Sequence, residues 1–351
     1  MTHIAKPKFH HPALPANAHG LTRRDYEGVV STLCAGCGHD SVSAAIIEAC
    51  FELDIEAHRI AKVSGIGCSS KTTNYFLGRS HGFNSVHGRM PAVATGANLA
   101  NRDLIYIGVS GDGDTASIGL GQFCHAVRRR LNMLYLVENN GTYGLTKGQF
   151  SATNDRRSRS RKGADNLFEA IDLAALAIEL GAGFVARSFS GDKAQLVPLM
   201  KAAIRYRGFA LIDVISPCVT FNNHAASTKS YDYVREHNAA LDRIDIVPHE
   251  TAITVDYEAG SSTDVPLHDG SVLRLHKLAD DYDPCDRAAV LRTLEHLKAA
   301  GEVATGLLYL EPGETDLHGL IGTSAAPLNS FAEADLCPGN AALEAINASH
   351  S

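Results

Sequence analysis

Two short apolar runs in the middle of the chain restrict its fold more than any other feature. Residues 104–109 and 133–137 are almost entirely aliphatic or aromatic, which is typical of strands buried on both faces of a sheet. Between them, residues 117–130 are long enough to form a crossover helix. Because strand–helix–strand units build parallel sheets and the alternation continues to residue 215, we predict a doubly wound, mainly parallel α/β sheet.

Each of these two strands is followed by glycines and oxygen-bearing side chains. Residues 111–114 read Gly-Asp-Gly-Asp, and residues 139–142 read Asn-Asn-Gly-Thr. In an open α/β sheet, ligands bind where the carboxyl ends of the strands meet. Hard oxygen ligands from two loops suit a divalent cation, and glycines let backbone N–H groups approach phosphate oxygens. Either loop alone is more simply a turn, but the pair predicts the diphosphate half of a thiamine diphosphate (TPP) site.

Four cysteines form a second group of candidate ligands. Cys34 and Cys37 lie in a Cys-Ala-Gly-Cys-Gly-His motif, and Cys68 and Cys218 lie on loops expected to follow strands. Four thiolates can hold an iron–sulfur cluster. A zinc ribbon would normally have a second Cys-x-x-Cys motif, which the sequence lacks. On spacing alone, zinc and redox roles remain alternatives.

Basic side chains near these loops are candidates for contact with anionic groups. His87 precedes Gly-Arg, while Lys71 and Lys147 lie close to the cysteine and Asn-Asn loops. Each could equally be solvated. The basic run at residues 156–162 is usually a solvated loop, and its alternatives are docking of an acidic partner or contact with coenzyme A phosphates.

Composition narrows the class of protein. The formal charge of -7 over 351 residues argues against nucleic-acid binding. There is no apolar stretch of about 20 residues for a membrane span and no signal-peptide pattern, so we expect a cytoplasmic protein. We divide the chain into a polar arm (1–20), a cofactor domain (21–245) and a C-terminal extension (246–351) packed on the sheet.

Together, these motifs closely resemble the β subunit of 2-oxoacid:ferredoxin oxidoreductases. The resemblance runs from about residue 25 to 240 and rests on residues 34–39, 65–69, 87–89, 111–114, 138–149 and 216–218. It implies the TPP-binding fold of the type that holds the diphosphate (PP-type). The segment 143–149, Tyr-Gly-Leu-Thr-Lys-Gly-Gln, is most like the 2-oxoglutarate branch, since pyruvate enzymes tend to differ there.

The resemblance also implies a role for individual residues. A [4Fe-4S] cluster would be held by Cys34, Cys37, Cys68 and Cys218. Mg²⁺ would be bound by Asp112, Asn140 and the carbonyl of Thr142. TPP would be lined by Ile66, Gly67, Cys68, Ser69, His87, Gly113, Asp114, Gly144 and Leu145. On position alone, the candidates for catalytic side chains are Lys71, His87 and Lys147.

The implied reaction needs a second chain. The family's α subunit carries the pyrimidine-side domain and its glutamate, usually in an (αβ)₂ heterotetramer. The expected reaction is reversible, CoA-dependent oxidative decarboxylation of 2-oxoglutarate, with electrons passed through the cluster to ferredoxin. The same chemistry on pyruvate or another 2-oxoacid is the alternative. A non-catalytic electron-transfer or zinc-scaffold subunit, and a cluster-free TPP decarboxylase or synthase, are the other hypotheses.

Overall fold

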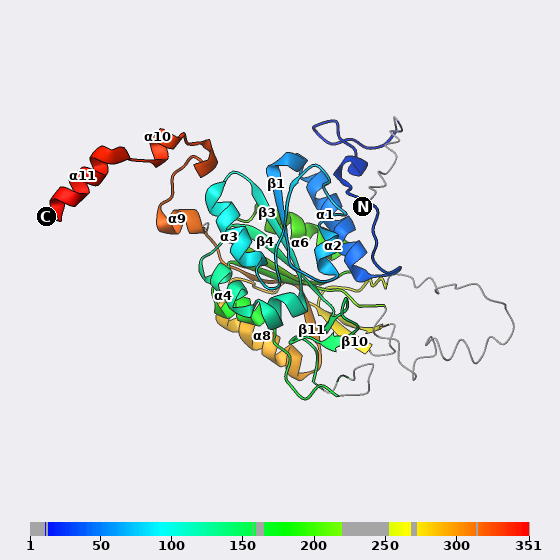
Figure 1. Cartoon of the computed structure of the whole chain (residues 1–351). Coiled ribbons are helices and arrows are strands. Elements are labelled where there is room, and N and C mark those ends of the chain that lie inside the picture. Colours follow the sequence, from blue (N-terminus) through cyan, green and yellow to red (C-terminus); the bar gives the residue numbers. More distant parts are fainter. Residues whose placement is uncertain are drawn as a thin grey trace.

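The computed structural model describes residues 11, 13–156, 158, 165–219, 253–267, 272–313 and 315–350. Within them, nine strands form one sheet in the order β2-β1-β3-β4-β8-β7-β11-β10-β9 (Figure 1). The strands are β1 (Ile60–Ser64), β2 (His81–Asn84), β3 (Ile105–Gly111), β4 (Met133–Asn139), β7 (Phe184–Phe189), β8 (Phe209–Ile215), β9 (Ser262–Pro266), β10 (Val272–Lys277) and β11 (Val303–Leu310). A separate hairpin pairs β5 (Thr142–Tyr143) with β6 (Gln149–Phe150).

The predicted mainly parallel sheet is confirmed. All pairings from β2 across to β7 are parallel. The C-terminal extension behaves differently from our expectation, because β11 pairs antiparallel with β7 and continues the sheet. It therefore covers the hydrogen-bonding edge that β7 would otherwise expose. The predicted boundary at residue 245 lies outside the described residues and stays a prediction.

Helices cover both faces of the sheet (Figure 1). The helices are α1 (Gly38–Glu52), α2 (Ser69–Thr72), α3 (Met90–Ala100), α4 (Leu120–Arg128), α5 (Leu173–Glu179), α6 (Lys193–Arg205), α8 (Arg287–Ala299), α9 (Leu317–Ile321), α10 (Glu333–Leu336) and α11 (Gly339–Ser349). Successive residues of β4 point to opposite faces. Leu134 and Leu136 pack with α1 and α6, whereas Tyr135 and Val137 pack with α3, α4, α5 and α8.

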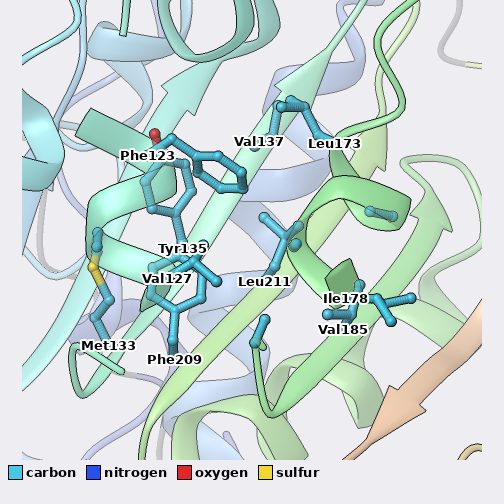
Figure 2. Packing of buried hydrophobic residues seen from close by; sticks show 14 of the residues in the cluster. Phe123, Val127, Met133, Tyr135, Val137, Leu173, Ile178, Val185, Phe209 and Leu211 are labelled. Atoms are coloured by element: carbon cyan, nitrogen blue, oxygen red, sulfur yellow. The ribbon is translucent and has the colours of Figure 1, made fainter. Parts of the chain in front are cut away.

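Aromatic side chains fill the second of these layers. Phe123 on α4 meets Tyr135 edge to face, with ring centroids 5.3 Å apart, and Phe209 on β8 completes the group (Figure 2). Such pairs contribute about 0.5–1.5 kcal/mol beyond burial. This packing fixes β4 and β8 beside one another under α4, and with them the loops at their carboxyl ends.

The starts of two helices are set by local structure. Helix α5 starts at Leu173, because the Asp172 side chain accepts hydrogen bonds from the N–H groups of Ala174 and Ala175 and caps it. The crossover expected from residue 117 begins with a π-helical turn, Gly113–Ile118, before α4. At the other end of the chain, α10 and α11 project away from the body (Figure 1).

Candidate active site

A cavity of about 260 Å³ opens at the carboxyl ends of β1, β3 and β4. Its walls come from the loops that follow these strands and from the β5 segment. The lining residues are His39, Ile66, Gly67, Cys68, Ser69, His87, Gly111, Asp112, Gly113, Asp114, Ile118, Glu138, Asn140, Thr142, Tyr143, Gly144, Leu145 and Thr146. The fold thus brings the loops singled out in the sequence to one place.

Asp112 and Asn140 are joined directly. Asp112 Oδ1 accepts a hydrogen bond from the Asn140 N–H at 3.2 Å, and its Oδ2 accepts bonds from the hydroxyls of Thr153, at 2.7 Å, and Ser151. Asn140 Oδ1 accepts from the N–H of Thr142 at 3.0 Å. Burial raises the pKa of Asp112 in spite of these bonds. A bound cation would favour its ionised form, so this oxygen-rich pair suits Mg²⁺.

Asp114 has a different role from Asp112, because its carboxylate ties neighbouring loops together. Its Oδ1 accepts from the N–H of Gly88 at 2.7 Å, and its Oδ2 accepts from the N–H of Ile66 at 3.2 Å and from Ser110 Oγ at 3.0 Å. These bonds hold the loops after β1, β2 and β3 around one cavity. Asp114 is therefore a positioning residue for the cavity wall.

Glycines at the cavity allow close approach of its walls. A Cβ at Gly113 would lie 2.6 Å from the ring of Tyr143, whose hydroxyl donates to the carbonyl of Gly113 at 3.1 Å. Gly67, with φ of +96°, adopts a conformation that favours glycine. Because Gly67 and Gly113 carry no side chains, space and backbone N–H groups are left beside the cavity, as a phosphate-binding wall requires.

The loop after β5 forms the open rim of the cavity. Leu145 is 56% exposed there, and the β5–β6 hairpin holds the loop at its base. Lys147 is exposed, with a φ of +80°, and does not line the cavity. Lys71 on α2 also lies outside the lining, whereas His87 is exposed at the rim.

The four predicted cluster cysteines lie on loops beside the cavity. The Cys37 N–H donates to the Cys34 carbonyl at 3.1 Å across Gly36, whose φ is +79°. Burial raises the pKa of Cys37, and the nearby Cys218 raises it further. Burial also raises the pKa of Cys68, to which Cys34 adds. Soft thiol donors suit iron–sulfur or zinc chemistry, and binding would release their protons.

No preformed metal cage is present in the part of the chain that the structure describes. There, no three histidine, cysteine, aspartate or glutamate side chains converge in a way that could hold an ion. Cys218 lies near enough to Cys37, and Cys34 near enough to Cys68, to raise the pKa of Cys37 and of Cys68, but no three such side chains converge in the described structure. The donor types therefore fit a cluster, while the cluster assignment itself stays a prediction.

Two buried polar residues of the lining, Glu138 and His39, lie within the sequence motifs, but the sequence predicts no role for them. Glu138 is fully buried, and Thr72 Oγ1 donates to its Oε2 at 2.9 Å. Burial raises the pKa of Glu138 well above its usual value. His39 Nε2 lies 3.8 Å from Glu138 Oε2, and burial lowers the pKa of His39 to about 4. The sequence signal that could have identified Glu138 is an acidic residue directly after the apolar run 133–137.

The predicted residues thus separate into two groups. All nine predicted TPP-lining residues and the three predicted Mg²⁺ ligands surround the cavity. Cys34, Cys37, Cys218, Lys71 and Lys147 lie outside its lining. Most of the basic run 156–162 is outside the described residues; Arg156 pairs with Glu169 at 2.8 Å on the surface.

Comparison with known proteins agrees with this arrangement. The family model for the thiamine pyrophosphate enzyme C-terminal TPP-binding domain matches residues 65–214. The 2-oxoacid:ferredoxin oxidoreductase subunit beta of Sulfolobus is 42% identical over 191 residues, covering 54% of this chain and 63% of that protein. The 2-oxoglutarate synthase subunit KorB of Methanocaldococcus jannaschii is 38% identical over 189 residues, covering 54% of this chain and 69% of that protein.

A solved structure extends the likeness over almost the whole chain. The 2-oxoglutarate:ferredoxin oxidoreductase from Magnetococcus marinus, with 2-oxoglutarate, coenzyme A and succinyl-CoA bound, has a TM-score of 0.68 and 26% identity. The match covers 92% of this chain and 98% of that chain. The curated alignments are shorter, and the first of them spans 63% of its relative's length. Among the described residues, none of the helices is both long and apolar enough to cross a membrane. On these comparisons, the chain belongs to the family of β subunits of 2-oxoacid:ferredoxin oxidoreductases.

Proposed function

We propose that this chain is the β subunit of a 2-oxoglutarate:ferredoxin oxidoreductase. The reaction is CoA-dependent oxidative decarboxylation of 2-oxoglutarate to succinyl-CoA and CO₂, with two electrons passed on to ferredoxin. The observation that carries the proposal is the contact between Asp112 and Asn140 at a cavity also lined by Cys68. This contact supports a diphosphate-type site beside the loops that hold the candidate cluster ligands.

In this proposal, the cavity holds Mg²⁺ and TPP. Asp112, Asn140 and the Thr142 carbonyl would bind the metal, and the glycine-lined wall around Gly67 and Gly113 would receive the diphosphate. The chemistry at the 2-oxo carbon is supplied by bound TPP, which provides a nucleophilic carbon and an electron sink. The chain's own contribution is to bind, to orient and to exclude water. An α subunit would complete the site with the pyrimidine-side domain.

The electron path would run from the cavity to the cysteine loops. Cys68 lines the cavity and also belongs to the predicted cluster ligands, with Cys34, Cys37 and Cys218. A [4Fe-4S] cluster held there would accept electrons singly and pass them to ferredoxin. Because Cys68 would belong to both the cavity wall and the cluster, electrons would leave the cavity over a short distance. A cluster-free decarboxylase would have no such electron path.

The choice of 2-oxoglutarate rests on two supports. The segment 143–149 resembles the 2-oxoglutarate branch, and its residues 143–146 line the cavity. The Magnetococcus marinus protein with the related structure has 2-oxoglutarate bound. We propose Lys71, His87 and Lys147 for contact with the substrate, and of these three residues His87 lines the cavity.

The test is a turnover assay on the chain co-expressed with its α partner and purified without oxygen. Reduction of a low-potential dye is followed with CoA and 2-oxoglutarate, pyruvate or a branched 2-oxoacid in parallel. We expect the fastest reduction with 2-oxoglutarate and none without CoA. If protein loaded with iron, Mg²⁺ and TPP reduces no dye with any 2-oxoacid, the proposal is wrong. Equal rates with pyruvate would reject only the substrate assignment.

A further inference from the structure

Glu138 leaves one buried oxygen without a partner at the wall of the cavity. Its side chain is fully buried, it lines the cavity, and Oε1 has no hydrogen-bond partner in the described structure. A buried polar atom without a partner is costly and calls for an explanation. Since Glu138 belongs to a cavity wall, a bound ligand can supply the missing contact.

The surroundings hold the carboxyl group in place. Thr72 Oγ1 donates to Oε2 at 2.9 Å. His39 stands 3.8 Å from the same oxygen, and its Nδ1 is 2.6 Å from Ser216 Oγ. Both contacts engage the Oε2 side, so Oε1 is the atom left for an occupant of the cavity. Thr72 lies on α2, His39 on α1 and Ser216 directly after β8, and thus the position does not depend on a single element.

The two other carboxylates of the cavity are already engaged. Asp112 receives bonds from Asn140, Ser151 and Thr153, and it is the proposed metal ligand. Asp114 receives two backbone N–H groups and a serine hydroxyl. Among the described lining residues, Glu138 is therefore the acid with an oxygen still available to a ligand.

The chemistry of TPP and of the 2-oxoacid indicates which ligand group would contact Glu138 Oε1. Burial favours the neutral form of Glu138, whereas a cation next to Oε1 favours the ionised form. The diphosphate and the 2-oxoacid present anionic oxygens, which an ionised Glu138 would repel. The thiazolium ring of TPP is cationic, and a cation taken out of water needs an electron-rich partner. Glu138 is also near Cys37 and Cys68, since it helps to raise the pKa of both thiols.

We propose that Glu138 is a positioning residue for TPP, whose Oε1 faces the cationic thiazolium ring at the side of the cavity nearest the cysteine loops. The proposal rests on the proposed function, because it requires TPP in this cavity. It orients the cofactor with its diphosphate at Asp112 and Asn140 and its ring toward Cys68. Glu138 thus provides charge complementarity for the ring, whereas the Asp112–Asn140 pair provides it for the metal.

A pair of ligands that differ only in ring charge tests this directly. The αβ complex is titrated calorimetrically with Mg²⁺ and either TPP or the analogue in which a neutral thiophene ring replaces the thiazolium. We expect Glu138→Leu to weaken TPP at least about tenfold relative to the neutral analogue, the range expected for a lost contact to a charged group. Glu138→Gln, which keeps the volume and the Thr72 contact, should shift the same ratio in the same direction but less.

Controls separate this proposal from general damage and from failure of the proposed function. Asp112→Asn should weaken both ligands equally, and Glu56→Gln, which changes an exposed acid before β1, should change neither. If Glu138→Leu does not fold, the Glu138→Gln ratio decides. An unchanged ratio, including equal losses for both ligands, overturns the role of Glu138. Failure of the wild-type complex to bind either ligand would instead overturn the proposed function.

Discussion

The carboxylate of Asp112 and the backbone N–H of Asn140 lie 3.2 Å apart, although β3 and β4 are separated by a complete helical crossover. The contact exists because β3 and β4 are parallel neighbours, with Gly111 opposite Glu138 in register. The residues directly after this pair therefore emerge side by side. Two loops that are unremarkable alone become a single oxygen-rich corner of the cavity.

Removing the charge of Asp112 should strongly weaken metal-dependent cofactor binding. Asp112→Asn keeps the size of the side chain but weakens a direct ligand. Changes in residues that merely support metal ligands cost about 10–100-fold in affinity, so we expect a larger loss of Mg²⁺–TPP affinity. Isothermal titration calorimetry on the αβ complex measures it. Asp103→Asn, an exposed acid before β3, is the control. Equal affinities in the two variants would remove Asp112 from the metal site.

The cysteine assignment predicts a selective loss of iron. Serine at position 34, 37, 68 or 218 should lower the iron and acid-labile sulfide of the purified complex and stop dye reduction. Cys285→Ser, at an exposed position in the extension, should leave both unchanged. Iron analysis and the cluster's visible absorption report the result. Retention of iron after Cys37→Ser, or full turnover after Cys34→Ser, would favour the zinc or cluster-free alternatives.

Lys62 should make stability depend on pH in the alkaline range. It is buried on β1, its Nζ donates to the carbonyls of Phe76 and Leu77, and burial lowers its pKa to about 8 from 10.5. The unfolded chain therefore binds more protons than the folded chain between these values, so stability rises with pH from about 8 to 10.5. The full effect is at most about 3 kcal/mol.

The matching measurement compares urea unfolding at pH 7 and pH 9.5 in wild type and Lys62→Met. The difference in unfolding free energy between the two proteins should change with pH, because only wild type gains from losing the proton. Lys193→Met, at an exposed position on α6, should follow the wild-type profile. A pH-independent difference for Lys62→Met would show that Lys62 titrates outside this range.

A buried ion-pair group formed by Arg187, Asp172 and Asp213 should be important for the stability of the folded chain. Arg187 on β7 binds Asp172 at 2.5 Å and Asp213 at 2.9 Å. Burial alone would raise the pKa of Asp172, but Arg187 and the cap of α5 lower it below its usual value. Arg187→Met leaves both acids unpaired and should lower the unfolding free energy by about 3–5 kcal/mol.

An exposed pair provides the control for this prediction. Arg274 and Asp264 lie 2.7 Å apart on the surface of β9 and β10, where solvent screens such pairs and they contribute little to stability. The loss of unfolding free energy, measured by chemical denaturation, should therefore be several-fold larger for Arg187→Met than for Arg274→Met. Asp213 also accepts from Asn139 Nδ2 at 3.0 Å, so Mg²⁺–TPP affinity should fall in Arg187→Met as well. Similar small losses in both variants would contradict the role of the buried group.

The sequence by itself determined the central strands and the loops that follow them. Strands buried on both faces are continuous apolar runs, so β3, β4 and β8 could be located directly. The residue types needed for metal, phosphate and cluster binding stand at the ends of these runs. Because parallel strands end at one edge, their convergence could be predicted without coordinates.

Only the tertiary structure decided the features that depend on distant neighbours. A lysine interrupts β1, and its burial depends on carbonyls supplied by residues 76 and 77. The extension joins the sheet because β7 offers an unpaired edge, which no local pattern in residues 303–310 reveals. Glu138 becomes a buried acid with an unpartnered oxygen because Thr72 and His39 enclose it. Apolar periodicity is local information, whereas enclosure is a property of the packed chain.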